Sequence, residues 1–393
     1  MNEVVLLIRY GEIANKGNNR SQFERLLQQR IQTQLFEFAN VRVSRLSGRM
    51  VVRCSRQDLP KIERELHKVF GIVGMARAIS VPLQYQTILQ ASREYAIEEL
   101  SGDRFTTFKV EVKRANKQFP VQSQELARQI GGEMLRANSR LQVDVHHPDI
   151  EFHVELRENE AFLYHHSIPG LGGLPTGMSG RAGLLLSGGI DSPLAGWYAL
   201  KRGLEILPIH FHSQPFTSER ALQKVWTLAG KLAAFGAETT LYTLSVTEIQ
   251  AAIRRECPSM LHTILLRRMM LRLAEAVCRE EQCLALVSGD SLGQVASQTL
   301  EALYAQDEVL HMPIFRPLIM MDKVQIIDEA RKIGTYETSI LPYDDCCTLF
   351  APKNPKTRPS LFEIQRAEAH LSIEDLLKDA LATTEKRSIC SID

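Results

Sequence analysis

The stretch Gly183–Gly196, GLLLSGGIDSPLAG, decides the fold of this chain. Its three leucines form a short apolar run between small residues, which is typical of a buried parallel strand. Gly188 and Gly189 have no Cβ, so they permit positive φ and let backbone N–H groups converge on an anion. Ser192 is a favoured N-cap and Pro193 suits the first helical position, so the helix that follows should turn its positive dipole end toward the loop. The stretch therefore predicts a phosphate-binding turn between a strand and a helix.

The type of phosphate loop follows from the residues around the glycines. No lysine follows them, which excludes an ordinary Walker P-loop, and the spacing is not that of a dinucleotide fingerprint. The SGGxDS pattern instead resembles the PP-loop of the N-type ATP pyrophosphatases. These enzymes transfer AMP onto a substrate and release pyrophosphate.

Length and composition set the outer limits. A chain of 393 residues that is 44% hydrophobic has enough material for roughly two or three domains. No apolar run has the length of a membrane span, and the N-terminus has no basic segment with a cleavage site, so we expect a cytoplasmic protein that does not contact a membrane. The net charge of +1 means that any nucleic-acid binding must come from local patches. Seven cysteines without a CxxC pair argue against a disulfide framework and a zinc site, so any thiol chemistry would be catalytic.

The N-terminal part, residues 1–75, predicts a ferredoxin-like α+β unit. Residues 4–8 form an apolar strand, and a helix with one apolar face follows from Ser21. Residues 42–54 alternate as a hairpin, and a second helix covers 59–70. The arginines of the hairpin fit a solvated face as well as an RNA surface.

A second unit occupies residues 76–167. Strands are predicted at 106–112, 150–156 and 161–165, with a helix at 124–137. Lys113, Arg114 and Lys117 beside Phe119 combine cations with an aromatic ring, as RNA-binding surfaces do. A generic basic turn explains these residues equally well.

Residues 168–181 are rich in glycine and proline and predict a linker into a domain at 182–393. Strands and helices alternate in that domain, which predicts a doubly wound parallel sheet covered by helices on both faces, with ligands at the carboxyl ends of the strands. The loops 187–192, 210–216 and 289–298 follow such strands. Near the C-terminus we expect helices at 361–370 and 372–382, the second with a capping box at Ser372 and Asp375.

Several signatures in this chain resemble those of the ThiI family of tRNA 4-thiouridine synthases, or tRNA sulfurtransferases. They are RYGEIANKGNNR from Arg9, the PP-loop stretch, HFHSQPFTSERA from His210, LLRRMMLR around Arg267, SGDSLGQVASQT from Ser288, RPLIMMDKVQIIDEARKIGTYETSI from Arg316 and PYDDCCTLFAPKNPKTRP from Pro342. The resemblance covers essentially the whole chain. It implies a ferredoxin-like domain, a THUMP domain that binds tRNA and a PP-loop pyrophosphatase domain, and it favours the RNA reading of Lys113, Arg114 and Lys117.

The resemblance also implies the reaction. ATP adenylates O4 of a uridine, at position 8 of tRNA, and sulfur from an enzyme-bound cysteine persulfide then replaces that oxygen. The products are 4-thiouridine, AMP and pyrophosphate. The cofactors implied are ATP and Mg²⁺, and we assign the metal to Asp191, for which a helix-capping role is the alternative. The nucleotide contacts implied are Leu185, Leu186, Ser187, Gly188, Gly189, Ser192, His210, Phe211, Arg267, Gly289 and Gln298.

The residues alone leave two points of that assignment undecided. Arg268 and Arg272 compete with Arg267 for the phosphates. Cys347 is favoured as the persulfide carrier with Cys346 as the second choice, although incidental thiols are the alternative and the flanking lysines and aspartates pull the thiol chemistry in opposite directions. We expect Cys390, in the C-terminal tail, to take no part.

The remaining expectations concern partners. The sequence has no room for a rhodanese domain after the PP-loop domain, so a cysteine desulfurase is the expected sulfur donor. Adenylation of a ubiquitin-like sulfur-carrier protein for thiamine thiazole synthesis is an alternative function with the same loop chemistry. A homodimer is also compatible with the sequence. An RNA-binding module with a vestigial nucleotide site is a third interpretation, which the intact loop disfavours.

Overall fold

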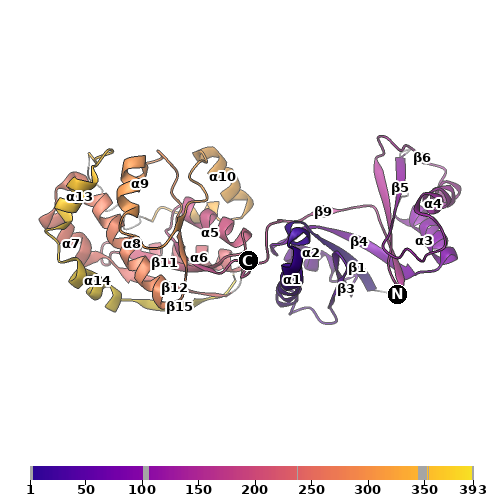
Figure 1. Cartoon of the computed structure of the whole chain (residues 1–393), viewed down its shortest axis with the longest axis horizontal. Coiled ribbons are helices and arrows are strands. Elements are labelled where there is room, and N and C mark those ends of the chain that lie inside the picture. The colour runs from indigo at the N-terminus through magenta and orange to yellow at the C-terminus, as the bar shows by residue number, and fades with distance from the viewer. Residues whose placement is uncertain (1–2, 101–105, 237, 344–351, 353, 392–393) are drawn as a thin grey trace. The chain divides into compact units, whose positions relative to one another are not determined.

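The computed structural model describes residues 3–100, 106–236, 238–343, 352 and 354–391. Two compact units make up the chain, Met1–Gly172 and Gly173–Asp393 (Figure 1). No helix among the described residues is both long and apolar enough to cross a membrane.

The first half of the N-terminal unit has the predicted order of strand, helix, hairpin and helix. Its elements are β1 (Glu3–Tyr10), α1 (Arg20–Gln34), β2 (Arg42–Leu46), β3 (Arg49–Ser55), α2 (Leu59–Leu66) and β4 (Ile72–Pro82). Strand β1 pairs antiparallel with β3 on one side and β4 on the other. Leu6 and Ile8 of β1 pack against Leu27 and Ile31 of α1, so the helix covers one face of the sheet.

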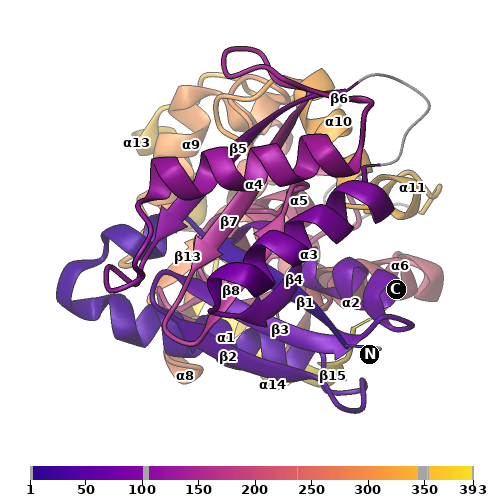
Figure 2. The same ribbon diagram turned by 90° about the vertical axis from the view of Figure 1, so that its right-hand side faces the viewer.

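The second half of this unit continues the same sheet. Its elements are α3 (Tyr85–Glu98), β5 (Thr106–Arg114), α4 (Ser123–Ala137), β6 (Leu141–Val143), β7 (Ile150–Leu156), β8 (Glu160–Tyr164) and β9 (Ile168–Pro169). Within the described residues the strand order is β2-β3-β1-β4-β8-β7-β5-β6, with β9 beside β4. Helices α3 and α4 lie side by side over this half of the sheet (Figure 2). The long strand β4 joins both halves because its first part pairs with β1 and its last part with β8.

The C-terminal unit is a mostly parallel α/β sheet. Its principal elements are β10 (Arg181–Leu185), α5 (Asp191–Lys201), β11 (Glu205–His212), α6 (Glu219–Ala233), β12 (Thr239–Ser245), α7 (Thr247–Glu256), α8 (His262–Glu280), β13 (Ala285–Val287), α9 (Leu300–Asp307), β14 (Ile314–Phe315), α10 (Lys323–Lys332), α11 (Tyr336–Ser339), α13 (Leu361–Glu368), α14 (Ile373–Ala382) and β15 (Glu385–Ile389). The strand order over the described residues is β14-β13-β10-β11-β12-β15. All pairs are parallel except that of β15 with β12.

The order of these strands creates a crevice beside β10. The chain runs outward from β10 through β11 to β12 and then returns to place β13 on the other side of β10. Loops that leave β10 and β13 therefore diverge at the carboxyl ends of the strands, which is where ligands bind in doubly wound sheets. The predicted parallel sheet is confirmed, and so is the position of the SGGxDS turn at its carboxyl edge.

Four local features differ from what the residue types alone suggest, and two of them, the caps expected at Ser192 and Ser372, were wrong predictions. Helix α5 begins at Asp191 with Ile190 as N-cap, so Ser192 lies within the first turn instead of capping it. Gly188 and Gly189 are not among the glycines with positive φ. Ser372 makes no capping hydrogen bond, whereas the side chain of Ser360 and that of Glu363 form a capping box at the start of α13.

The fourth concerns the C-terminal tail. Residues 385–389 pair with 239–243 of β12 and complete the edge of the sheet. The run EKRSI is too polar for its sequence to predict a strand. In the structure four of its five residues are exposed, because the strand lies at the edge of the sheet. Cys390 follows this strand directly and is exposed.

Candidate functional site

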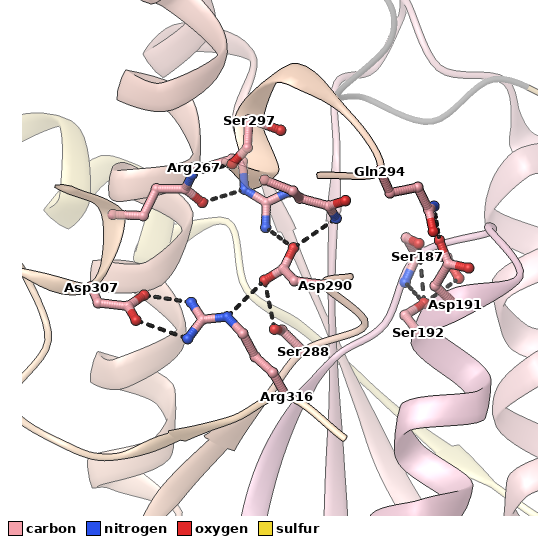
Figure 3. Close-up of polar contacts among 12 residues, drawn as sticks. Ser187, Asp191, Ser192, Arg267, Ser288, Asp290, Gln294, Ser297, Asp307 and Arg316 are labelled. Atoms are coloured by element: carbon pink, nitrogen blue, oxygen red, sulfur yellow. Dashed lines mark hydrogen bonds and ion pairs between the residues drawn. The ribbon is translucent and has the colours of Figure 1, made fainter. Parts of the chain in front are cut away.

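The turn that follows β10 is held by its two serines. The backbone N–H of Ser187 donates to Oγ of Ser192 at 2.9 Å, and the two hydroxyl oxygens are 3.1 Å apart. Gly189 N–H donates to Oγ of Ser187 at 3.2 Å. Ser192 thus ties the end of the strand to the start of the helix, which explains why it lies inside α5 and not at its cap (Figure 3).

A cavity of about 410 Å³ opens beside this turn. All the residues predicted to contact nucleotide or metal line it: Leu185, Leu186, Ser187, Gly188, Gly189, Asp191, Ser192, His210, Phe211, Arg267, Gly289 and Gln298. They come from the carboxyl ends of β10, β11 and β13 and from helix α8. The sheet therefore collects into one place residues that are up to 113 positions apart, from Leu185 to Gln298.

The floor of the cavity combines apolar surface with one oriented histidine. Nδ1 of His210 lies 2.9 Å from the carbonyl oxygen of Leu186. Because a carbonyl oxygen can only accept, Nδ1 carries the hydrogen of this bond. His210 and the neighbouring Phe211 are both buried, and Phe211 belongs to the core that packs against α8.

Asp191 occupies the first position of α5 and binds two side chains from elsewhere in the unit. Its Oδ1 accepts from Nζ of Lys323 at 2.8 Å. Its Oδ2 accepts from Nε2 of Gln294 at 2.9 Å (Figure 3). Within the described ranges no three His, Cys, Asp or Glu side chains are grouped as metal ligands. A single carboxylate next to a phosphate loop suits Mg²⁺, which takes one or two protein carboxylates and completes its shell with phosphate oxygens and water.

A buried carboxylate, Asp290, organises the opposite wall. Its Oδ1 accepts from Nη2 of Arg267 and, at 3.0 Å, from Nε2 of Gln298. Its Oδ2 accepts from Oγ of Ser288 at 2.7 Å and from Nε of Arg316 at 3.2 Å (Figure 3). Burial alone would raise the pKa of Asp290, but the charges of Arg267 and Arg316 and the hydrogen bonds hold it well below its usual range.

This network orients the side-chain oxygen of Gln298 as a hydrogen-bond acceptor. The Oε1 atom of Gln298 is buried and has no hydrogen-bond partner in the described part of the chain, while its Nε2 is held by Asp290. Because the side chain lines the cavity, Oε1 can accept from an amino group such as that of adenine.

Gly289 is required for backbone approach. A Cβ placed there would lie 2.6 Å from the backbone nitrogen of Ser192 and 2.7 Å from the carbonyl carbon of Asp191. The loop after β13 thus touches the first turn of α5 directly.

The structure separates the three arginines of α8. Arg267 lines the cavity and binds Asp290 together with Oε1 of Gln306, at 2.6 Å. Arg268 is fully buried and pairs with Glu368 of α13, and Arg272 pairs with the same carboxylate. Arg268 and Arg272 of α8 therefore pair with α13, whereas Arg267 lines the site.

The structure places the three basic residues predicted to bind RNA in two different environments. Lys113 and Lys117 are exposed. Arg114 donates to the carbonyl oxygens of Val121 and Lys117, at 2.9 and 2.8 Å, and so closes the turn that carries them. Phe119 is only 7% exposed and belongs to the core under α4, so the expected stacking platform for a base is wrong.

Four cysteines belong to the core of the described part of the chain: Cys54, Cys257, Cys278 and Cys283 are buried. Cys346 and Cys347 lie outside the described residues. Burial and nearby carboxylates raise the pKa of Cys257 to about 11, so its thiol is unreactive at neutral pH.

The site residues that were not predicted include Lys224, Asp290, Gln294, Lys323 and Arg316. Asp290 had a signal, since it is an acidic residue three positions after the buried strand β13, inside the quoted SGDSLGQ stretch. Lys323 and Lys224 had no such signal in the sequence. Each lies in an ordinary helical pattern, and only tertiary packing decides what its side chain faces.

Comparison with known proteins matches every part of the chain to one family. Residues 177–373 match the family model described as thiamine biosynthesis protein (ThiI), residues 5–76 match the ThiI ferredoxin-like domain and residues 85–166 match the THUMP domain. A probable tRNA sulfurtransferase of Caldanaerobacter subterraneus subsp. tengcongensis is 47% identical over 373 residues, which cover 95% of this chain and 97% of that protein. One from Brevibacillus brevis is 47% identical over 99% of this chain and 97% of its own length.

Two solved structures show the same architecture. A 4-thiouridine synthetase in complex with RNA and bound ATP superposes with a TM-score of 0.90, is 36% identical and covers 98% of this chain and 99% of that one. The protein PH1313 from Pyrococcus horikoshii gives a TM-score of 0.65 at 24% identity, over 84% of this chain and 99% of its own, which shows a shared fold. From its three matched domains and its full-length relatives, the chain belongs to the ThiI family of tRNA sulfurtransferases.

Proposed function

We propose that this protein is an ATP-dependent tRNA sulfurtransferase that converts a uridine, at position 8 of tRNA, into 4-thiouridine. The observation that carries the proposal is the cavity at the carboxyl ends of β10, β11 and β13, lined by a SGGxDS turn without a Walker lysine. The similar 4-thiouridine synthetase, solved with RNA and ATP, supports the same reading.

The first step is adenylation. The carbonyl O4 of uridine is a very poor leaving group, so it attacks the α-phosphorus of ATP and pyrophosphate departs with the bridging oxygen. Backbone N–H groups of the Ser187–Ser192 turn and the start of α5 supply dipoles for the phosphates. Arg267, fixed by Asp290, is the side chain on the opposite wall that reaches into the cavity.

Mg²⁺ is the metal that we assign to Asp191. The ion neutralises phosphate charge and polarises the α-phosphoryl group when it arrives with ATP. Asp191 would hold it, and Gln294, which donates to the same carboxylate, orients that side chain.

The second step replaces oxygen by sulfur. A persulfide on Cys347, with Cys346 as the second candidate, attacks C4 of the adenylated uridine, and AMP leaves with O4. Cleavage of the sulfur–sulfur bond then leaves sulfur on the base, and either a second thiol or an external reductant must supply the two electrons. A cysteine desulfurase is the expected source of the persulfide sulfur. The tRNA is expected to contact Lys113, Arg114 and Lys117 through its phosphates.

The test uses the full chain with ATP, Mg²⁺, unmodified tRNA transcript, cysteine and a cysteine desulfurase. We expect near-ultraviolet absorbance of 4-thiouridine and one AMP per thiolated base. Asp191→Asn should lower the rate by about 100-fold or more, as expected for loss of a metal ligand. Asp322→Asn is the matched control, since Asp322 caps α10 beside Lys323 but does not touch Asp191.

Cysteine variants separate the two steps. Cys347→Ser should retain tRNA-dependent pyrophosphate release and lose thiolation, while Cys390→Ser should behave as wild type. Thiolation by Cys347→Ser at the wild-type rate would transfer the role to Cys346. AMP formation that requires a sulfur-carrier protein instead of tRNA would favour the alternative role in thiamine thiazole synthesis; the family model's description names thiamine biosynthesis.

A further inference from the structure

Helix α6 carries a buried lysine that takes no part in the assignment above. Lys224 is 6% exposed and is the only lysine among the buried residues of the described ranges. A lysine is rarely buried without a reason, because desolvation of its ammonium group is costly. The burial of Lys224 therefore indicates that its positive charge has a function.

Lys224 lies directly over the phosphate turn. A Cβ placed on Gly188 would lie 3.3 Å from both Cδ and Cε of Lys224 and 3.5 Å from its Nζ. A side chain at position 188 would therefore crowd the lysine stem, and glycine leaves room for it although its φ is not positive. The side chain lines the same cavity as the turn.

One contact of the ammonium group with the chain is a hydrogen bond to a backbone carbonyl. Nζ of Lys224 donates to the carbonyl oxygen of Leu341 at 2.9 Å. An ammonium group has three donors, so the contact with Leu341 fixes its position and is compatible with a phosphate ligand.

We propose that Lys224 binds the β- and γ-phosphates of ATP and stabilises the pyrophosphate as it leaves. This inference rests on the proposed function. When the bond between the α-phosphorus and the bridging oxygen breaks, the electron pair stays on that oxygen and negative charge grows on pyrophosphate. A preorganised, buried cation stabilises this charge in the transition state more than in bound ATP, and it needs no proton transfer.

The same contact reaches a part of the chain that is close in sequence to the candidate persulfide carriers. Leu341 precedes Cys346 by five positions in the sequence.

The main test compares Lys224→Met with Lys231→Met in the full chain. Lys231 is on the same helix and also donates to a carbonyl oxygen, that of Gly334 at 2.6 Å, but it does not line the cavity. Lys224→Met should lower the single-turnover rate of tRNA-dependent pyrophosphate release by about 100-fold, the size expected for a lost transition-state donor. It should weaken pyrophosphate binding by about 10-fold or more while leaving AMP binding within about 2-fold, and Lys231→Met should change none of these.

A second measurement needs no variant. An acyl phosphate of ATP, with the reactive group on the γ-phosphate, acylates an amine that lies against the terminal phosphates and releases ATP. Peptide mass spectrometry of the wild-type protein should find the new amide on Lys224 and its protection by pyrophosphate. Acylation of Lys323 alone would contradict the proposal, whether or not Lys224→Met folds.

The outcomes also separate this inference from the proposed function. Absence of tRNA-dependent pyrophosphate release in the wild-type protein would contradict the function. A wild-type protein that is active together with an equally active Lys224→Met would overturn only the role of Lys224. Equal loss of AMP and pyrophosphate binding in Lys224→Met would mean a collapsed cavity and would likewise overturn the role.

Discussion

At the scale of single residues, the site depends on how buried charges are shared. Asp290 is a carboxylate at the end of β13 that binds two arginines and a glutamine at once. Because it holds Arg267 and Gln298 in the cavity, it acts on the nucleotide through them and is a positioning residue. Removal of its charge would leave Arg267 and Arg316 close together without their common counter-ion.

Asp290→Asn should therefore weaken ATP binding by about 10- to 100-fold, as expected when a buried ion pair that orients a ligand contact is broken. Asp307→Asn is the matched control, because Asp307 binds Arg316 at 2.8 Å and does not contact Arg267. We expect both variants to lower the melting temperature, and only Asp290→Asn to raise the KM for ATP. An unchanged KM in Asp290→Asn would contradict the positioning role. Equilibrium binding of ATP and steady-state kinetics provide the measurements.

At the scale of elements, strand β7 carries a second buried carboxylate with a purely structural role. Glu155 accepts from Nη2 of Arg49 at 2.8 Å, from Nη2 of Arg157 at 2.6 Å and from the hydroxyl of Tyr164 at 2.8 Å. Since Arg49 begins β3, the cluster ties the ferredoxin-like half of the N-terminal unit to its THUMP half. Burial alone would raise the pKa of Glu155, but the charge of Arg49 and these hydrogen bonds lower it to about 2.

The pH dependence of stability follows from that pKa. In the unfolded chain the pKa of Glu155 is near 4.5, so its contribution is complete above pH 4.5, falls between pH 4.5 and 2, and is lost below 2. Glu155→Gln should lower the free energy of unfolding of the N-terminal unit by about 3 kcal/mol at pH 7 and by much less near pH 2.

Urea unfolding followed by far-ultraviolet circular dichroism at both pH values measures the difference. Glu111→Gln is the control, since Glu111 pairs with Lys109 on a more exposed face and should change stability by less than about 0.5 kcal/mol. Equal unfolding midpoints for Glu155→Gln and the wild-type protein at pH 7 would show that the cluster contributes nothing.

At the scale of the whole molecule, each of the two units has its own core. The apolar cluster of the C-terminal unit joins β11, β12 and α8, whereas separate clusters fill the two halves of the N-terminal unit. The proposed ATP site lies entirely within Gly173–Asp393. A ligand that binds only the folded form of one unit stabilises that unit, because its binding free energy is not shared with an independent core.

ATP at a concentration of 100 times its Kd should therefore raise the free energy of unfolding of the C-terminal unit by about 2.7 kcal/mol. Hydrogen exchange measured by mass spectrometry on the full chain should slow in β10, β11, β13 and α8. Exchange in β1 to β8 should be unchanged. Equal slowing in both units would show that they unfold as one cooperative body.

Much of this fold was readable from the sequence because its signals are local. The apolar run and small residues of Gly183–Gly196 indicated the strand and the turn, and helical periodicity indicated the start of α1 and both ends of α4 to within one residue. Strand β4 was missed, although every second residue near its start is buried, because no turn signal isolates it. Strand β15 was missed since its residues are polar and only its pairing with β12 makes it a strand.

The sequence by itself determined the parallel sheet and the phosphate turn, because strand periodicity and turn chemistry depend on neighbours along the chain. The set of nucleotide contacts at the carboxyl edge was implied by the resemblance to a known family. Only the tertiary structure decided which charges belong to the site. Arg267 was separated from Arg268 and Arg272 by the packing of α13, and Lys224 was placed over Gly188 by the facing of α6. The physical reason is that the free energy of a buried charge depends on its partners in space, and those partners are as far apart in the sequence as Lys224 and Leu341.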